Sequence, residues 1–148
     1  MSARTFLDTS VLVWVHDSQD GRAQRRIIER LAREQQSGSP VVSSNVLAEL
    51  YVALTRVRGR KSKAPLLTRE EAAEAVAAAA SYHVVPVTGA DVLAAVSLRD
   101  RRQMSFWDAL NLASALAHGC TRMLSCDAQS ARVPEGIEYE NPLDESER

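Results

Sequence analysis

The stretch near the beginning of the chain reads TFLDTSVLVWV over residues 5–15. Its first three residues are apolar or β-branched and predict a short buried strand that ends at Asp8. Residues 11–15 are so rich in β-branched side chains that their propensity favours a strand. We interpret them instead as a short helix that begins after Ser10. A strand followed directly by a helix is the unit that alternates along α/β domains.

The same alternation continues along the rest of the chain. Further strands are predicted at residues 41–42, 83–87 and 122–125, with a short edge strand at 137–139. Helices are predicted at residues 22–36, 44–58, 68–81, 88–102 and 105–118. Short apolar strands joined by helices imply parallel crossovers. The predicted fold is therefore α/β, a single domain with a central, mainly parallel sheet of four to five short strands and helices on both faces.

Polar residues mark the beginnings of several of these helices. A serine at 43 or 44 is expected to cap the helix that follows the second strand. Thr68 and Thr88 each stand three residues before an acidic side chain, which is the pattern of a capping box. Asp91, the acidic partner of Thr88, therefore has a structural role that explains its presence.

Length and composition favour one ordinary globular domain. The chain has 148 residues, of which 45% are hydrophobic and 25% charged, so disorder and fibrous repeats are not indicated. We assign residues 1–140 to the domain and residues 141–148 to an acidic C-terminal tail. Six acidic residues and one arginine give residues 135–148 a charge of −5, which leaves residues 1–134 with +4 of the total of −1. A mildly basic body can bind a polyanion.

The two cysteines and the ends of the chain indicate the compartment. Cys120 and Cys126 form no CxxC pair and have no nearby histidine pattern, so neither a zinc site nor a disulfide is expected. The first residues contain no signal peptide, and no run approaches the ~20 apolar residues that span a bilayer. We expect a cytoplasmic protein.

Four carboxylates are candidates for a functional site. Asp8 and Asp127 directly follow the first and fourth predicted strands, while Glu49 and Asp108 lie early in helices. Ligands of such sheets bind at the carboxyl ends of the strands, where these residues are expected to meet. Carboxylates that converge without a cation repel one another, and oxygen ligands suit Mg²⁺ or Mn²⁺.

Each carboxylate also has a structural alternative. Asp8 and Asp127 are compatible with turn positions after a strand. Asp108 stands three residues after Ser105 and fits a capping box. Glu49 is harder to explain in this way, because its helical neighbours are apolar and no lysine or arginine lies three or four residues away.

These residues occur in motifs that resemble a known family, the PIN domain, and within it the small VapC-type toxins. The resemblance extends over nearly the whole chain. Its motifs are FLDTSVL at residues 6–12, SNVLAEL at 44–50 and, most specifically, SFWDALNLASA at 105–115. The fourth motif matches in part, since Ser125 replaces the family's threonine and no aromatic residue follows Asp127. Ser10 and Ser125 carry hydroxyls that suit water, a metal ion or a capping role.

The resemblance implies an activity and partners. It implies a Mg²⁺- or Mn²⁺-dependent endoribonuclease with Asp8, Glu49, Asp108 and Asp127 as metal ligands and catalytic residues. It further implies an RNA substrate, a small cognate antitoxin protein and a homodimer, as in the toxin of a type II toxin–antitoxin pair. Two alternatives remain open: a non-catalytic PIN-like module that binds RNA or protein, and a DNA-directed nuclease.

Other charged residues are less specific. Two basic runs suit contacts with phosphates but equally suit solvated segments. His16, His83 and His118 are not assigned to acid–base work. The basic runs comprise Arg56, Arg58, Arg60, Lys61 and Lys63, and then Arg99, Arg101 and Arg102.

Overall fold

A computed structural model of the chain describes residues 3–58, 64–127 and 136–144. Its centre is a five-stranded sheet in the order β3-β2-β1-β4-β5. Every neighbouring pair of strands is parallel, which confirms and sharpens the predicted α/β class. The strands are β1 (Arg4–Leu7), β2 (Ser39–Ser43), β3 (His83–Val85), β4 (Arg122–Leu124) and β5 (Glu138–Glu140).

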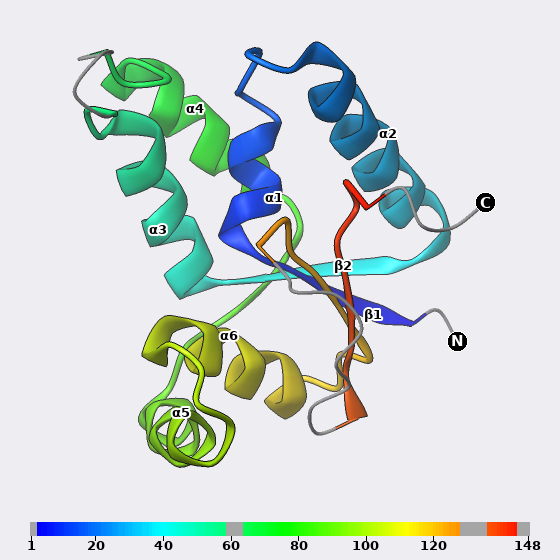
Figure 1. Cartoon of the computed structure of the whole chain (residues 1–148), viewed down its shortest axis with the longest axis vertical. Coiled ribbons are helices and arrows are strands. Elements are labelled where there is room, and N and C mark those ends of the chain that lie inside the picture. Colours follow the sequence, from blue (N-terminus) through cyan, green and yellow to red (C-terminus); the bar gives the residue numbers. More distant parts are fainter. Residues whose placement is uncertain (1–2, 59–63, 128–135, 145–148) are drawn as a thin grey trace.

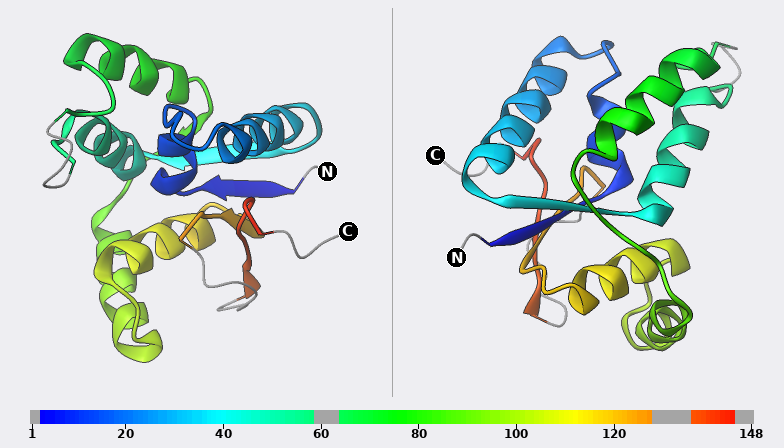
Figure 2. Two further views of the ribbon diagram at one scale, coloured as in Figure 1. Left: turned by 45° about the horizontal axis from the view of Figure 1, so that its top comes forward. Right: turned by 180° about the vertical axis from the view of Figure 1, so that it is seen from behind.

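Helices cover both faces of this sheet, as predicted. Four helices, α1 to α4, lie on one side, while α5 and α6 pack against each other on the opposite side (Figure 1). The two further views in Figure 2 show the same two layers. The helices are α1 (Thr9–Trp14), α2 (Gly21–Ser37), α3 (Ser44–Thr55), α4 (Arg69–Ala79), α5 (Gly89–Arg102) and α6 (Phe106–Ala117).

The strand order places a topological switch between β1 and β4. From β1 the chain moves through β2 to β3 at one edge, and it then returns to β4 and β5 on the other side of β1. Phe6 of β1 therefore pairs with Val41 on one side and with Met123 on the other. In open parallel sheets, ligands bind at the carboxyl edge beside such a switch.

Burial on both faces explains the consecutive apolar residues in the central strands β1 and β2. Phe6 and Leu7 are neighbours, so their side chains point to opposite faces of the sheet, and both are fully buried. Val41 and Val42 repeat this arrangement in β2. The layer of α6 adds Leu112 to the same core.

The helix predicted against propensity after the first strand is confirmed. It begins at Thr9, earlier than expected, because the Asp8 side chain caps it and accepts a hydrogen bond from the Thr9 amide. The serine cap of α3 is Ser43, whose hydroxyl accepts from the Val46 amide. The capping boxes opening α4 and α5 are present as predicted.

The second strand differs from its predicted extent. It begins at Ser39 and includes Pro40, two residues that precede the strand predicted at 41–42. Pro40 is tolerated because only β1 lies beside it, since pairing with β3 begins one residue later at Val41.

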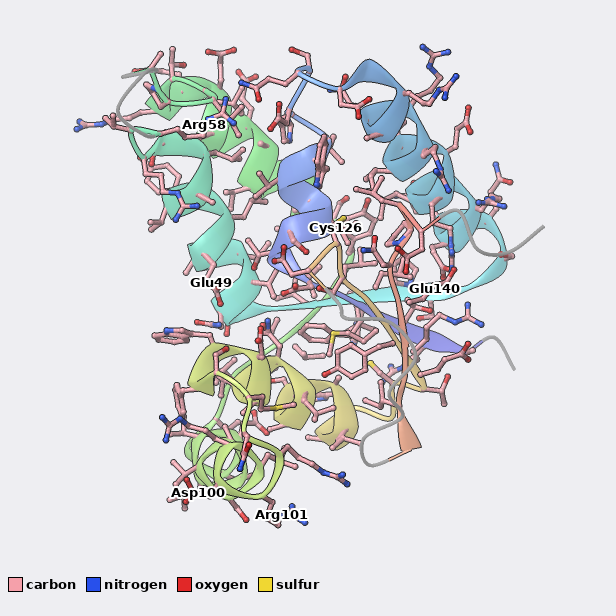
Figure 3. The ribbon with its side chains drawn as sticks, viewed as in Figure 1. Glu49, Arg58, Asp100, Arg101, Cys126 and Glu140 are labelled. Atoms are coloured by element: carbon pink, nitrogen blue, oxygen red, sulfur yellow. The ribbon has the colours of Figure 1, made fainter. Side chains whose placement is uncertain are left out.

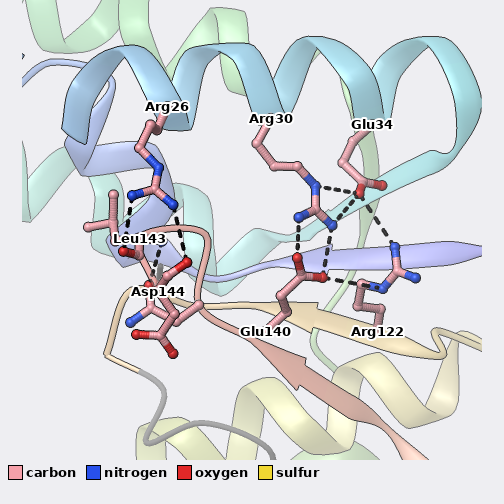
Figure 4. Close-up of polar contacts among 8 residues, drawn as sticks. Arg26, Arg30, Glu34, Arg122, Glu140, Leu143 and Asp144 are labelled. Atoms are coloured by element: carbon pink, nitrogen blue, oxygen red, sulfur yellow. Dashed lines mark hydrogen bonds and ion pairs between the residues drawn. The ribbon is translucent and has the colours of Figure 1, made fainter. Parts of the chain in front are cut away.

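An ion-pair network attaches the last strand to α2 (Figure 4). The Arg30 guanidinium donates to the Glu34 carboxylate at 2.9 Å and also to the Glu140 carboxylate of β5. Arg122 of β4 lies 3.7 Å from the same two carboxylates. Arg26 donates to the backbone carbonyls of the residues at 143 and 144, so the first part of the predicted tail contacts α2. Residues 145–148 lie outside the described residues, and the domain boundary at 140 stays a prediction.

None of the helices in residues 3–58, 64–127 and 136–144 is both long and apolar enough to cross a bilayer.

Candidate functional site

One groove at the carboxyl edge of the sheet collects all four predicted carboxylates. Its volume is about 620 Å³, and Asp8, Glu49, Asp108 and Asp127 all contribute to its lining. Asp8 follows β1, Asp127 follows β4, and Glu49 lies in the second turn of α3. The first turn of α6 supplies Asp108, because α6 runs back from this edge to the opposite end of β4. The sheet topology thus brings together residues that are far apart in sequence.

The Asp8 carboxylate is held by hydrogen bonds to both of its oxygens. Oδ1 accepts from the Thr9 amide at 2.9 Å and from Asn111 Nδ2 at 3.0 Å. Oδ2 accepts from the hydroxyls of Ser10 at 3.1 Å and Ser125 at 2.8 Å. These donors come from α1, α6 and the end of β4, so they fix Asp8 at the meeting point of three elements.

Burial and like charge both act on the acidic residues of the groove. Burial raises the pKa of Asp8, hydrogen bonds led by that from Ser125 oppose the shift, and the charge of Asp108 adds to it. Burial likewise raises the pKa of Glu49, and the charges of Asp8 and Asp108 push it further in the same direction. Three of the four carboxylates therefore repel one another, and a bound cation would relieve this repulsion.

Glu49 has one close polar neighbour on its own helix. Asn45 Nδ2 donates a short hydrogen bond to Glu49 Oε1, which partly opposes the rise in the pKa of Glu49. Figure 3 shows Glu49 near the beginning of α3, the end closest to α6. A half-buried carboxylate here agrees with its apolar helical surroundings in the sequence.

Asp108 and Asp127 are more exposed than the other two carboxylates. The Asp108 amide donates to the Ser105 hydroxyl at 3.1 Å, so Ser105 caps α6 while the Asp108 carboxylate lines the groove. This is one half of the capping box that the sequence suggested. The Asp127 amide donates to Ser125 Oγ at 3.2 Å. Burial raises the pKa of Cys126 to about 12, and the charges of Asp127 and Asp8 contribute to that rise. Asp127 and Asp8 therefore both act electrostatically on the same thiol.

The donor set of the groove fits a hard divalent cation. Within the described residues, no three side chains of histidine, cysteine, aspartate or glutamate already lie in a ready-made metal-ligand group. The groove nevertheless offers carboxylate oxygens, which Mg²⁺ and Mn²⁺ prefer. Beside Asp8, the Asn111 Oδ1 atom is buried and accepts no hydrogen bond in the described part of the chain. Buried polar atoms of this kind call for a partner such as water or an ion.

Asn111 is the site residue that the sequence analysis missed. It is only 4% exposed, lines the groove and donates directly to Asp8. A signal was present, because an amide stands between two leucines in an otherwise apolar helix, three residues after Asp108. Such a position is buried, and a buried amide needs polar neighbours.

The first basic run lies partly at the groove. Arg56 and Arg58 line it beyond the end of α3, and Arg58 forms an ion pair of 3.2 Å with Asp17. Figure 3 shows Arg58 at the opposite end of α3 from Glu49. Arg60, Lys61 and Lys63 lie outside the described residues. The second run ends α5, and it does not contribute to the groove.

Asp91 and the three histidines lie away from the acidic groove. Asp91 forms the capping box of α5 with Thr88, is buried, and lines a separate cavity, so its structural interpretation is confirmed. His16, His83 and His118 do not line the acidic groove.

The fold and the groove define a class of protein: a parallel α/β domain that gathers acidic side chains beside the switch in its strand order. Comparison with known families narrows the class. The family model of the PIN domain matches residues 5–136, and the chain belongs to the PIN domain family. The fold that the motifs led us to expect is confirmed. Among curated protein sequences, no significant relative of this chain is found.

Solved structures of toxin–antitoxin proteins have the same fold. VapBC2 from Rickettsia felis, bound to a DNA fragment from its promoter, has a TM-score of 0.67 at 15% identity and covers 93% of this chain and 98% of its own. A toxin–antitoxin complex from Klebsiella pneumoniae has the same TM-score and identity, and the match covers 93% of this chain and 97% of the chain from the complex. VapC20 from Mycobacterium tuberculosis, a sarcin–ricin loop cleaving toxin, has a TM-score of 0.56 at 25% identity and covers 80% and 86%.

Proposed function

We propose that this protein is a metal-dependent endoribonuclease and the toxin of a type II toxin–antitoxin pair. The observation that carries the proposal is the convergence of four carboxylates on one groove, together with the raised pKa values of Asp8 and Glu49. A site that concentrates negative charge would repel an RNA phosphate unless cations intervened. Membership of the PIN domain family supports a nuclease with divalent metal ions.

Asp8, Glu49, Asp108 and Asp127 would hold the Mg²⁺ or Mn²⁺ ions in this proposal. When bound, such an ion lowers the pKa of a coordinated water and offsets the charge that develops on the phosphate. The side chains of Ser10, Ser125 and Asn111 fix the orientation of Asp8 by donating to its carboxylate. The Asp127 amide also donates to the Ser125 hydroxyl, so the same serine contacts both Asp8 and the backbone of Asp127.

RNA is the substrate that the comparisons favour. VapC20 is described as cleaving the sarcin–ricin loop, which is RNA, and it is 25% identical to this chain. Arg56, which lines the groove beyond the end of α3, suits contact with a phosphate backbone, while Arg58 beside it is paired with Asp17. The structures from Rickettsia felis and Klebsiella pneumoniae contain antitoxins and support a small cognate antitoxin here. The homodimer stays an expectation from the resemblance, and the cytoplasmic location stays an expectation from the sequence.

Cleavage of matched substrates tests the catalytic part of this proposal. Purified protein is incubated with an RNA oligonucleotide and with DNA of the same sequence, each with Mn²⁺ or with EDTA. We expect cleavage of RNA only, and only with the metal ion. Cleavage of DNA alone would support the DNA-directed alternative, and binding of RNA without cleavage in any divalent ion would support the non-catalytic module.

Expression with its neighbouring reading frame tests the biological part. If a short reading frame directly upstream encodes the antitoxin, its product should restore growth to cells that express this chain and should copurify with it. Growth that is unaffected by expression of the active nuclease would contradict a toxin role without affecting the chemistry.

A further inference from the structure

A large aromatic side chain stands exposed at the edge of the acidic groove. Trp107 is 57% exposed and lines the groove, next in sequence to Asp108. Tryptophan is usually well buried, because exposing its ring to water is unfavourable. An exposed indole beside a group of carboxylates therefore needs an explanation beyond the folding of the domain.

The position of the ring is set by its neighbour. Phe106 packs against the core, and its ring meets Trp107 edge to face, with centroids 5.4 Å apart and planes inclined by 72°. Both residues lie in the first turn of α6, which is among the most closely packed helices. The Phe106 ring thus packs against Trp107, while more than half of the Trp107 side chain remains exposed.

The surroundings of Trp107 combine three kinds of surface along one groove. The carboxylates occupy the sheet edge, and Arg56 and Arg58 occupy the end of α3. Between them α3 contributes apolar surface, including Val52, which is 60% exposed. Arg58 is paired with Asp17, so a ligand that fits this order has anionic groups for metal ions and for Arg56 and a flat apolar face for the indole.

We propose that Trp107 stacks on an unpaired nucleobase adjacent to the phosphate held at the carboxylates. The inference rests on the proposed nuclease function and names its substrate class, an RNA with an exposed base in a loop or single strand. A nucleotide supplies both the anion and the flat aromatic face. A base within a duplex is stacked on both faces and cannot meet the ring, whereas a splayed base can stack on an aromatic side chain. Trp107 is then a positioning residue for the substrate.

Tryptophan emission measures this contact directly. The chain has two tryptophans, Trp14 and Trp107, so Trp14→Phe leaves Trp107 as the single emitter. This change is combined with Asp8→Asn to prevent cleavage, and a short oligouridylate is titrated in Mg²⁺. We expect saturable quenching by the single strand and little by the same strand within a duplex. Binding is measured separately by the fluorescence polarisation of a labelled strand. Unchanged Trp107 emission at saturated binding would overturn the proposal.

Cleavage kinetics give an independent test. Loss of a base–aromatic stack costs about 1–3 kcal/mol, so we expect Trp107→Ala to raise KM by about 5- to 150-fold, with a smaller effect on kcat. Trp107→Phe should keep KM close to the wild-type value, because phenylalanine retains an aromatic face. Leu93→Ala is the matched control, since Leu93 is apolar and 74% exposed on α5 but does not line the groove.

The outcomes separate the stack from the nuclease. Cleavage by wild type with equal KM values for Trp107→Ala and Leu93→Ala would leave the proposed function standing and would refute the stack. Quenching of Trp107 by RNA in a protein that never cleaves it would refute the nuclease and support the stack. Thermal unfolding of each variant confirms that the domain remains folded.

Discussion

Asp8 is the residue on which the groove is organised. It caps α1 and accepts hydrogen bonds from three further side chains, yet burial and the charge of Asp108 keep its pKa raised. Capping of α1 and a place in the acidic groove are therefore combined in one side chain. At Asp108 the two roles are divided, because the Ser105 hydroxyl caps the helix by accepting from the Asp108 amide while the Asp108 carboxylate contributes to the groove.

The raised pKa of Glu49 predicts a pH dependence of stability. The folded state holds the Glu49 proton more tightly than the unfolded chain does, so the metal-free protein loses stability as the pH rises above the ordinary glutamate value of about 4.3 and through the raised pKa. Glu49→Gln removes this penalty. In EDTA, the variant should therefore unfold at higher urea than wild type at pH 7, and the difference should shrink at pH 4.

A matched control accompanies that experiment. Glu29 is an exposed glutamate on α2 and does not line the groove, so Glu29→Gln should change little between the two pH values. If Glu49→Gln lowered the stability of the protein by the same amount at pH 7 and at pH 4, repulsion in the groove would not explain the pH dependence.

The pair Asp127 and Asp91 tests which aspartate completes the site. We expect Asp127→Asn to raise the Mn²⁺ concentration needed for cleavage, but less than Asp8→Asn does, since Asp127 is exposed and its motif is only a partial match. Asp91→Asn should leave cleavage nearly unchanged and cost about 1 kcal/mol of stability, because Asp91 serves the capping box of α5. Titration of cleavage against Mn²⁺ measures both. A large loss for Asp91→Asn with none for Asp127→Asn would reverse the assignment.

At the scale of elements, β5 supports the site from outside it. The Glu140 carbonyl accepts a hydrogen bond from the Ser125 amide at 3.0 Å, and Ser125 donates in turn to Asp8. The side chain of Glu140 is anchored by Arg30 of α2 and Arg122 of β4. The edge strand, one of the last described segments, thus contributes to the geometry of the first carboxylate.

Loosening this anchor should have a measurable effect. The Arg30 contact holds the pKa of Glu140 below its usual range, so the ion pair stabilises the fold at neutral pH and loses its effect as the pH falls through that lowered pKa. We expect Glu140→Gln to cost about 1 kcal/mol, since the pair is partly exposed and screened. Hydrogen exchange should become faster at the amides of β5 and at Ser125.

Glu138→Gln is the control on the same strand. Glu138 is exposed, and its substitution should leave the exchange of β5 unchanged. Equal exchange in wild type and Glu140→Gln would show that the backbone ladder alone holds β5.

The elements show how far the sequence could predict this fold. The order of strands and helices was predictable because buried parallel strands leave continuous apolar runs and because serine, threonine and glycine mark the helix ends. The beginning of β2 was not, since tolerance of Pro40 depends on how far its neighbour β3 extends. Asn111 was missed because its partner is 103 residues away, and only the folded arrangement joins them.

At the scale of the whole molecule, charge is distributed unevenly along the groove. The net charge of the chain is −1, but the groove has carboxylates at the sheet edge and Arg56 and Arg58 beyond α3. The predicted phosphate contacts of the first basic run therefore fall, in its described part, beside the proposed site. The remainder of the run stays a prediction.

A salt titration tests the arginine end. Removing one phosphate contact should reduce the slope of log K against log salt by about 0.7 for a single strand, so we expect Arg56→Gln to bind RNA more weakly and with a shallower slope. Arg99→Gln, on α5 and outside the groove, should leave the slope unchanged. Identical slopes for both variants and wild type would assign Arg56 to the solvated surface.

The central claim is that the acidic groove cleaves RNA with the help of divalent ions, and cleavage by Asp8→Asn tests it most directly. Asparagine keeps the size of the side chain and removes the charge. The hydroxyls of Ser10 and Ser125 can turn to accept hydrogen bonds from its amide group, so the fold should be retained. With Mn²⁺ and an RNA oligonucleotide, we predict cleavage by wild type and none above background by folded Asp8→Asn. Cleavage by Asp8→Asn at the wild-type rate would contradict the account.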